Sequence, residues 1–220
     1  MMAGGAFQDE NKKAVQKLAC PVQCGFGCYR PLNWRDTQET IIENTGIPPG
    51  NDLEAAIVQI LAPGSYTAVL RGNGGGTGIG LVEAYDLNSA NTNSQLANIS
   101  TRGLVQTGNN VMIGGIILGG GTGANEVLVR AIGPSLSQFG IPNALSDPTL
   151  GLYDGQGMLI RFNDDWRQNQ EAEIQATGIP PANNFESAVF EILPPSNYTA
   201  IVAGYNGATG VGLVEVYNLQ

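Results

Sequence analysis

Oxygen-rich side chains gather around a predicted β-hairpin in the second half of the chain. Asp154 ends the first strand of this hairpin, and Asn163-Asp164-Asp165 follows the second strand. Ca²⁺ prefers carboxylate, amide and carbonyl oxygens, and acids on adjacent loops can supply several of them. One interpretation of Asp154, Asn163, Asp164 and Asp165 is therefore a calcium site. The other is that these residues form Asx turns and cap the helix that follows.

Catalytic chemistry has little support in the sequence. The chain has no His, which excludes Ser-His-Asp and Cys-His mechanisms and the usual zinc sites. Ser135, in Gly-Pro-Ser-Leu, has neither a base nor a nucleophile-elbow motif. A hydrolase could instead use a carboxylate pair such as Asp164 and Glu186, but no pattern places these two in one cleft. We therefore expect no catalytic residue, no organic cofactor and no enzymatic activity.

The three cysteines lie close together, at Cys20, Cys24 and Cys28. On a helix this spacing would put them on one face, where they could hold a metal or a cluster with an outside ligand. Pro21 and Gly25 argue against a helix, and the spacing differs from the common Cys-x-x-Cys arrangement. Free thiols in an N-terminal tail are the alternative that we favour.

Two glycine-rich stretches and two tryptophans each have a functional and a structural interpretation. Residues 72–78 and 119–123 could be phosphate loops, but neither ends in Gly-Lys-Ser/Thr. Because each lies between predicted strands, we expect hairpin turns there. Trp34 and Trp166 are candidates for stacking on sugar rings, or for packing beneath a short helix.

Composition restricts the partners of the chain. The net charge is -9 and only ten residues are basic, so no cationic surface is available to follow a phosphate backbone. The apolar run at 111–118 is far shorter than the roughly 20 residues that a membrane helix needs. We therefore expect neither nucleic-acid binding nor membrane insertion. Charged residues make up 13%, about half of the usual roughly 25%, and the 31 Gly favour short strands joined by tight turns.

One segment of the chain is present twice. Residues 33–88 align with 165–220 at a constant offset of 132, without a gap and with about half of the positions identical. Further β-patterned sequence precedes only the second copy. We therefore expect an N-terminal tail of unclear structure at 1–30, a partial β repeat at 31–88, a linker at 89–95 and a complete β-sandwich repeat at 96–220. Leu32-Asn33 stands where the second copy has Asp164-Asp165, so calcium binding is expected in the second copy alone.

The hydrophobic pattern predicts an all-β fold made of antiparallel, jelly-roll-like β-sandwich repeats, one complete unit and one half unit. Each unit should carry one short helix, at 166–177 in the second copy, with Asp165 as its cap and Gly178 at its stop. The late strands are apolar on both faces, which predicts central strands covered on both sides. Strands are expected at 102–105, 111–118, 127–132, 149–153, 158–162, 187–193, 198–203 and 212–219.

The second unit resembles the bacterial pre-peptidase C-terminal domain and related β-sandwich modules. The resemblance covers roughly 145–220, and 128–136 is also similar to repeat modules of large surface proteins of environmental bacteria. It implies a secreted accessory module without catalysis, of a kind in which some members bind calcium or insoluble polymers. The segment 1–30 shows no apolar signal region. The residues that carry the resemblance are Asp147-Pro148-Thr149-Leu150, Leu152-Tyr153-Asp154, Gly157, Asn163-Asp164-Asp165 and Tyr198-Thr199-Ala200-Ile201-Val202.

Together these features predict a non-catalytic, extracellular structural or adhesive module, secreted or on the cell surface, that binds a polymer or calcium. One alternative is a subunit that self-associates by β-strand exchange through the half repeat, because a half sandwich should expose strand edges and an apolar face. Another alternative is an accessory domain of a secreted hydrolase.

Overall fold

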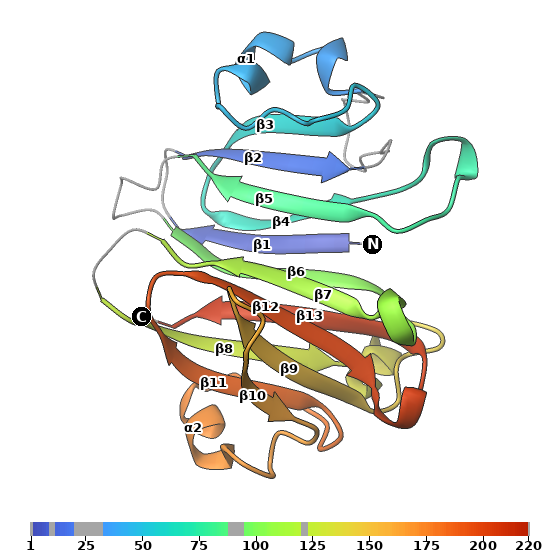
Figure 1. Ribbon diagram of the computed structural model, residues 1–220, viewed down its shortest axis with the longest axis vertical. Helices are drawn as coiled ribbons and strands as arrows, with labels where there is room; N and C mark the ends of the chain where they lie inside the picture. Colours follow the sequence, from blue (N-terminus) through green and yellow to red (C-terminus); the bar gives the residue numbers. More distant parts are fainter. Residues whose placement is uncertain (1, 9–11, 20–32, 88–94, 120–122, 220) are drawn as a thin grey trace. The chain divides into compact units, whose positions relative to one another are not determined.

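The structure, a computed structural model, describes residues 2–8, 12–19, 33–87, 95–119 and 123–219 (Figure 1). The chain divides into two compact units, Met1–Ala97 and Asn98–Gln220, and each unit is described by itself. Within the described ranges, no helix has the length and apolar character that crossing a membrane requires.

The first unit contains two groups of antiparallel strands. In one, β1 (Met2–Gln8) pairs with β4 (Gly64–Val69); in the other, β2 (Lys12–Ala19) lies between β3 (Ala55–Leu61) and β5 (Leu81–Asp86). The expectation of a separate tail at 1–30 therefore needs correction, because this segment supplies β1 and β2. The lysine-rich sequence of β2 gave no strand signal, because its partners lie far along the chain and strand propensity depends on such neighbours.

β2 takes the place in the first unit that β8 (Asn125–Ile132) takes in the second. Lys17 of β2 is opposite Ala56 on one side and Glu83 on the other. Arg130 of β8 is opposite Ala188 and Glu215, which are the aligned residues of the second copy. The similarity between the copies therefore extends beyond the aligned segment, to a strand that sequence comparison did not match.

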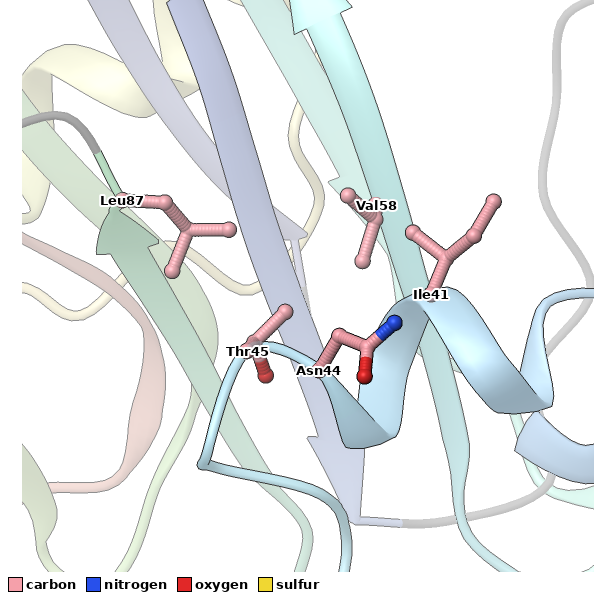
Figure 2. A pocket seen from close by; sticks show the side chains of 5 residues that line it. All are labelled: Ile41, Asn44, Thr45, Val58 and Leu87. Carbon is pink, nitrogen blue, oxygen red and sulfur yellow. The ribbon is translucent and has the colours of Figure 1, made fainter.

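Among the described residues, each unit carries one short α-helix, as predicted, but the helix begins later than expected. These are α1 (Glu39–Glu43) and α2 (Glu171–Ala176). Asp165 does not cap α2, because a separate turn precedes the helix and Gln170 occupies the N-cap position. The predicted stop is confirmed, since Gly178 has a left-handed φ of 74°. Beside α1 the first unit leaves a pocket of about 400 Å³ (Figure 2).

The second unit is a β-sandwich of two antiparallel four-stranded sheets, which confirms the predicted fold class. The first sheet has the order β11 (Ser187–Leu193), β8, β13 (Gly210–Asn218) and β6 (Gln95–Val105). The second has the order β10 (Leu159–Asn163), β9 (Pro148–Asp154), β12 (Asn197–Gly204) and β7 (Met112–Ile117). Short 3₁₀ turns complete the chain: Trp34–Asp36, Asn73–Gly75, Gly108–Asn110, Pro134–Phe139 and Tyr205–Gly207.

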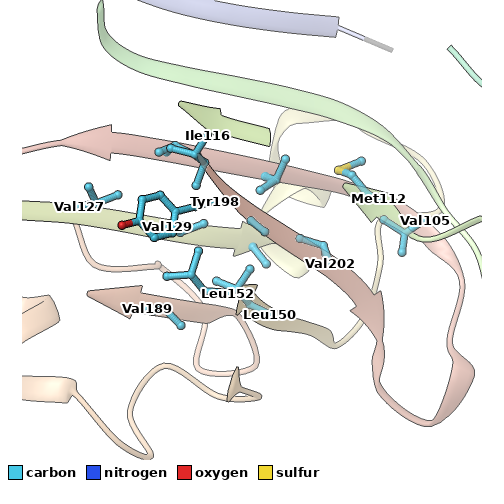
Figure 3. Packing of buried hydrophobic residues seen from close by; sticks show 14 of the residues in the cluster. Val105, Met112, Ile116, Val127, Val129, Leu150, Leu152, Val189, Tyr198 and Val202 are labelled. Carbon is cyan, nitrogen blue, oxygen red and sulfur yellow. The ribbon is translucent and has the colours of Figure 1, made fainter. Parts of the chain in front are cut away.

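The core of the second unit lies between the two sheets (Figure 3). Alternate residues of each strand point inward, so Leu150 and Leu152 of β9 face the core and are fully buried. Val202 of β12 and Val129 of β8 are also fully buried. The expectation that the late strands are covered on both faces holds only in part, because Ile201 on the outer face of β12 is half-buried.

Candidate functional site

The two tryptophans are structural. Trp34 and Trp166 are each 2% exposed, and their indole nitrogens donate hydrogen bonds to the carbonyl oxygens of Asn51 and Asn183, at 3.2 and 3.1 Å. An arginine guanidinium covers each ring, with its carbon 4.0 Å from the centre of Trp34 and 4.1 Å from the centre of Trp166. Neither ring is available to stack on a sugar, which leaves the packing interpretation.

The predicted calcium residues do not form one group. Asp154 Oδ1 accepts hydrogen bonds from the amides of Gln156 (2.9 Å) and Met158 (2.8 Å), so its carboxylate closes the hairpin turn. Asn163 lies at the other end of β10, opposite Leu150. Four residues of strand separate Leu150 from Asp154, roughly 13 Å at about 3.3 Å per residue. A single ion therefore does not contact Asp154 together with Asn163, Asp164 and Asp165.

Asn163 ties neighbouring segments together. Its side chain is 2% exposed; Oδ1 accepts from the Ala188 amide at 2.9 Å, and Nδ2 donates to the Asp165 carbonyl at 2.9 Å. Asp165 Oδ2 accepts from Gln168 at 2.7 Å. The contacts of Asn163 with Asp165 and of Asp165 with Gln168 are local to the turn after β10, whereas the Ala188 contact joins this turn to β11. None of them caps α2, so the expected helix cap is absent from these contacts.

Asp164 has a different environment, which it shares with Asp147. Each carboxylate has a buried Oδ1 without a hydrogen-bond partner in the described part of the chain. Burial raises the pKa of Asp147, and the charges of Asp164 and Asp165 raise this pKa further. Burial also raises the pKa of Asp164, with a further contribution from Asp165. An unpaired buried carboxylate is costly, and a proton or a bound cation would relieve this cost.

Backbone oxygens lie beside the same two carboxylates. Ser187 Oγ is 2.5 Å from the Pro148 carbonyl and also contacts the Asp164 carbonyl, so it links the first residue of β9 to the loop after β10. Among the described residues, no three His, Cys, Asp or Glu side chains are grouped as metal ligands. A cation here would therefore need two carboxylates and backbone oxygens.

Asp147 was not among the predicted site residues, although the sequence contains a signal for it. In an antiparallel hairpin, the residue before the first strand lies beside the residue after the second strand. Asp147 precedes β9 and Asp164 follows β10, so the predicted hairpin brings them together. Along the chain, Asp154 is nearer than Asp147 to Asp164.

Glu186, one member of the alternative catalytic pair, has its carboxylate engaged in bonds within the fold. Glu186 is fully buried, and its Oε1 accepts from the amides of Gly133 (3.2 Å) and Ser135 (3.0 Å). Its Oε2 accepts from the Asn183 amide at 3.1 Å. A carboxylate that is buried and holds three amides stabilises a loop and does not contact a substrate. Ser135 Oγ is buried and has no partner in the described part of the chain.

The remaining sequence candidates contribute no site. Residues 72–78 include the turn Asn73–Gly75, in which Gly74 and Gly75 have φ of 61° and 80°. The expected hairpin is wrong, because β4 pairs with β1 and β5 pairs with β2, so this turn joins two strands that are not neighbours in a sheet. The central residues of 119–123 lie outside the described residues, as do Cys20, Cys24 and Cys28.

The outer face of the second sheet is uncharged and largely apolar. Registers across four strands place Ile113, Ile201, Gly151 and Phe162 in one row. Ile113 is 58% and Phe162 51% exposed. A Cβ built on Gly151 would lie 2.8 Å from a ring carbon of Tyr153, so the Tyr153 ring lies over the glycine. We call this surface the outer apolar face; its members are Ile113, Ile117, Gly151, Tyr153, Leu159, Phe162 and Ile201.

The first unit has a pocket between α1, β3 and the end of β5. Three aliphatic side chains line it, Ile41, Val58 and Leu87, together with the polar residues Asn44 and Thr45 (Figure 2). Val58 is nearly buried at 7% exposure, whereas Ile41 is 52% exposed. The pocket is therefore apolar, uncharged along the described lining and open to solvent.

Comparisons with known proteins give distant similarities. No family model matches the chain, and no curated protein matches it. The pre-peptidase C-terminal domain of a collagenase from Bacillus anthracis is 13% identical with a TM-score of 0.34, and the match covers 53% of this chain and 86% of that domain. The VP2 subviral particle of infectious bursal disease virus is 7% identical with a TM-score of 0.23, and the match covers 99% of this chain and 56% of that one.

Proposed function

We propose that the chain is a non-catalytic structural and adhesive module, secreted or on a bacterial cell surface, that attaches to an insoluble polymer through the outer apolar face. The observation that carries the proposal is a row of apolar residues across four strands without a charged member, in which Ile113 and Phe162 are more than half exposed and Ile201 is half-buried. Contiguous exposed apolar patches mark binding surfaces, because exposed apolar area is unfavourable in water.

The extent of this face favours an extended polymer over a small ligand. The row crosses four neighbouring strands, which span roughly 14 Å at about 4.8 Å per strand. Apolar and aromatic groups spread over such a distance suit the apolar faces of a polysaccharide or a fibrous protein. Low charge supports the proposal, since no strong electrostatic term opposes approach to an uncharged polymer.

The test is depletion of the purified chain from solution by microcrystalline cellulose, chitin and fibrillar collagen. We expect at least one polymer to deplete it, and Ile113→Lys with Phe162→Lys to reduce binding at least tenfold. Phe139→Lys is the matched control, because Phe139 is 79% exposed but lies on the turn Pro134–Phe139, away from this face. Equal binding by the double variant and the wild type, or no depletion by any of the polymers, would contradict the proposal.

A second proposal concerns calcium. The buried, unpartnered Oδ1 atoms of Asp147 and Asp164 favour a cation bound between the loops before β9 and after β10, with Asp165 adding negative charge nearby. In isothermal titration calorimetry we expect one Ca²⁺ per chain, lost in Asp164→Asn and retained in Asp154→Asn. Binding that survives Asp164→Asn but not Asp154→Asn would reverse the assignment.

Self-association by strand exchange is the alternative function. Within the described part of the chain, β3 and β5 each have β2 on one side and no strand on the other. Such edges can accept a strand from a second copy. Light scattering across a concentration series tests this alternative, and a monomer at every concentration excludes it.

An accessory role beside a secreted hydrolase is compatible with the adhesive proposal, since this chain would then supply attachment and its neighbour the chemistry.

A further inference from the structure

The two copies differ in side-chain volume at one aligned position, where Val58 stands in the first and Phe190 in the second. The backbone is held in the same way at both. Gln38 donates to the Val58 carbonyl at 2.9 Å and accepts from its amide at 3.0 Å. Gln170 makes the same two bonds to Phe190, at 2.7 and 3.2 Å. The difference between the copies is therefore in the side chain and not in the path of the strand.

The buried surroundings of this position also match, whereas two lining residues differ: Ile41 and Asn44 stand where the second copy has Glu173 and Ala176. In the second unit Phe190 packs against a buried cluster that includes Trp166 and Ile174. In the first unit the aligned cluster includes Trp34, Ile42 and Val58. Valine lacks most of the volume of a phenyl ring, and the pocket of about 400 Å³ opens beside Val58. The second copy therefore shows which chemical group fits against this framework.

The lining defines the chemistry of the occupant. Ile41, Val58 and Leu87 offer apolar surface, and no charged residue is among the described lining residues. The Thr45 hydroxyl is engaged, because it donates to the Ile42 carbonyl at 2.6 Å. The Asn44 carboxamide makes no hydrogen bond within the described part of the chain, so it can serve one polar substituent. The volume falls within the roughly 300–1,000 Å³ of small-molecule sites, and a cavity of about 150 Å³ already accepts benzene.

We propose that this pocket of the first unit binds one neutral aromatic ring, in the position that the phenyl group of Phe190 fills in the second unit. Desolvation of the ring and of the aliphatic lining supplies the affinity, and Asn44 orients a polar substituent. The ring belongs either to a free small molecule or to an aromatic side chain of a polypeptide. The pocket lies outside the polymer-binding surface, and the two proposals stand independently.

The test is an NMR titration of the full chain with two probes, benzyl alcohol and N-acetyl-L-phenylalanine amide. We expect saturable shifts of the Asn44, Thr45 and Val58 amides, with a dissociation constant on the order of 1 mM for a single half-enclosed ring. Val58→Phe should weaken binding at least tenfold by filling the site from within. Phe190→Val is the reciprocal variant, and it should create a second set of shifts at Ala176 and Thr177.

The two probes distinguish the source of the ring. Binding of benzyl alcohol supports a free aromatic ligand, and binding of the phenylalanine amide alone supports a polypeptide partner. The proposal is overturned if neither probe gives saturable shifts at these amides, or if a folded Val58→Phe chain binds as tightly as the wild type. Dispersed amide spectra establish that each variant is folded. If Val58→Phe does not fold, Val58→Met replaces it with the same expected direction.

Discussion

Arg130 and Glu215 face each other across β8 and β13 and form an ion pair of 2.5 Å that is largely removed from solvent, with side-chain exposures of 15% and 12%. The same guanidinium donates to the Ile179 carbonyl at 2.7 Å and to the Tyr217 hydroxyl at 2.9 Å. One arginine therefore fixes the sheet to the segment that follows α2. Because both charges are satisfied by each other, loss of either partner would leave the other charge buried and unpaired.

Replacing Glu215 with Gln should destabilise the second unit by roughly 3–5 kcal/mol, because it leaves the Arg130 charge buried without a counterion. Urea unfolding measures this loss. The matched control is Glu171→Gln, which breaks an exposed pair with Arg167 and should cost less than about 1 kcal/mol. Equal losses in the two variants would mean that the Arg130–Glu215 pair contributes no more than a surface contact.

The pH dependence of stability should have an unusual contribution from Asp147 and Asp164. Both have a pKa in the folded state above the ordinary value, so the folded chain holds these protons more tightly than the unfolded chain does. Their contribution is complete below the unfolded pKa, about 3.9, and is lost as the pH rises through the folded pKa.

We therefore expect the double variant Asp147→Asn with Asp164→Asn to gain stability relative to the wild type as the pH rises from about 4 to 7. Urea unfolding at several pH values, without calcium, measures the difference. Saturating Ca²⁺ should reduce the difference at pH 7 by stabilising the wild type alone. A difference that does not change with pH would contradict the assigned environment of these carboxylates.

Gly133 should tolerate no side chain. A Cβ at this position would lie 2.2 Å from the carbonyl oxygen of Leu145, and a backbone atom cannot move aside as a flexible side chain can. Gly133→Ala should destabilise the chain by roughly 1–3 kcal/mol or more. Gly115→Ala provides the control, because no atom lies within 4 Å of the corresponding Cβ, and thermal unfolding should show little change.

Gln38 and Gln170 should behave alike in their respective units. Each side chain bridges a turn to the amide and carbonyl of a strand residue, Val58 or Phe190. Gln38→Ala and Gln170→Ala should each cost roughly 1–3 kcal/mol, because a partly buried amide and carbonyl lose their partners. Hydrogen exchange of the Val58 amide measures the effect of Gln38→Ala, and that of the Phe190 amide measures the effect of Gln170→Ala. If either substitution also speeds exchange of the amide in the other unit, the two units are not independent at this position.

The strands of the second unit could be predicted because their signals are local. Gly-Asn and Gly-rich turns separate short apolar runs, and the predicted runs at 149–153 and 187–193 coincide with β9 and β11 almost residue for residue. The α-helix was predicted too long, since a 12-residue pattern did not reveal the separate turn before Gln170. Short helices depend on tertiary bonds such as those of Gln170, which a periodic pattern does not contain.

The candidate site was less predictable for the same physical reason. Asp154 and Asn163 were grouped because they are near in sequence, yet a hairpin places them at its two ends. Asp147 is farther along the chain from Asp164 but meets it across the hairpin. The outer apolar face could not be predicted from the sequence either, since Ile113, Ile201 and Phe162 align only once the registers of four strands are known.

The position of β2 has a consequence for synthesis on the ribosome. Ala19 pairs with Leu81, so this strand is made long before the last of its partners. At about 5–20 residues per second, the 61 intervening residues take roughly 3–12 s to emerge, during which β2 lacks one neighbour. Until its partner is synthesised, the strand has an unpaired edge that a second nascent chain can pair with, and charged residues discourage such pairing. β2 contains Lys12, Lys13 and Lys17, and we expect these charges to reduce such pairing while the chain emerges.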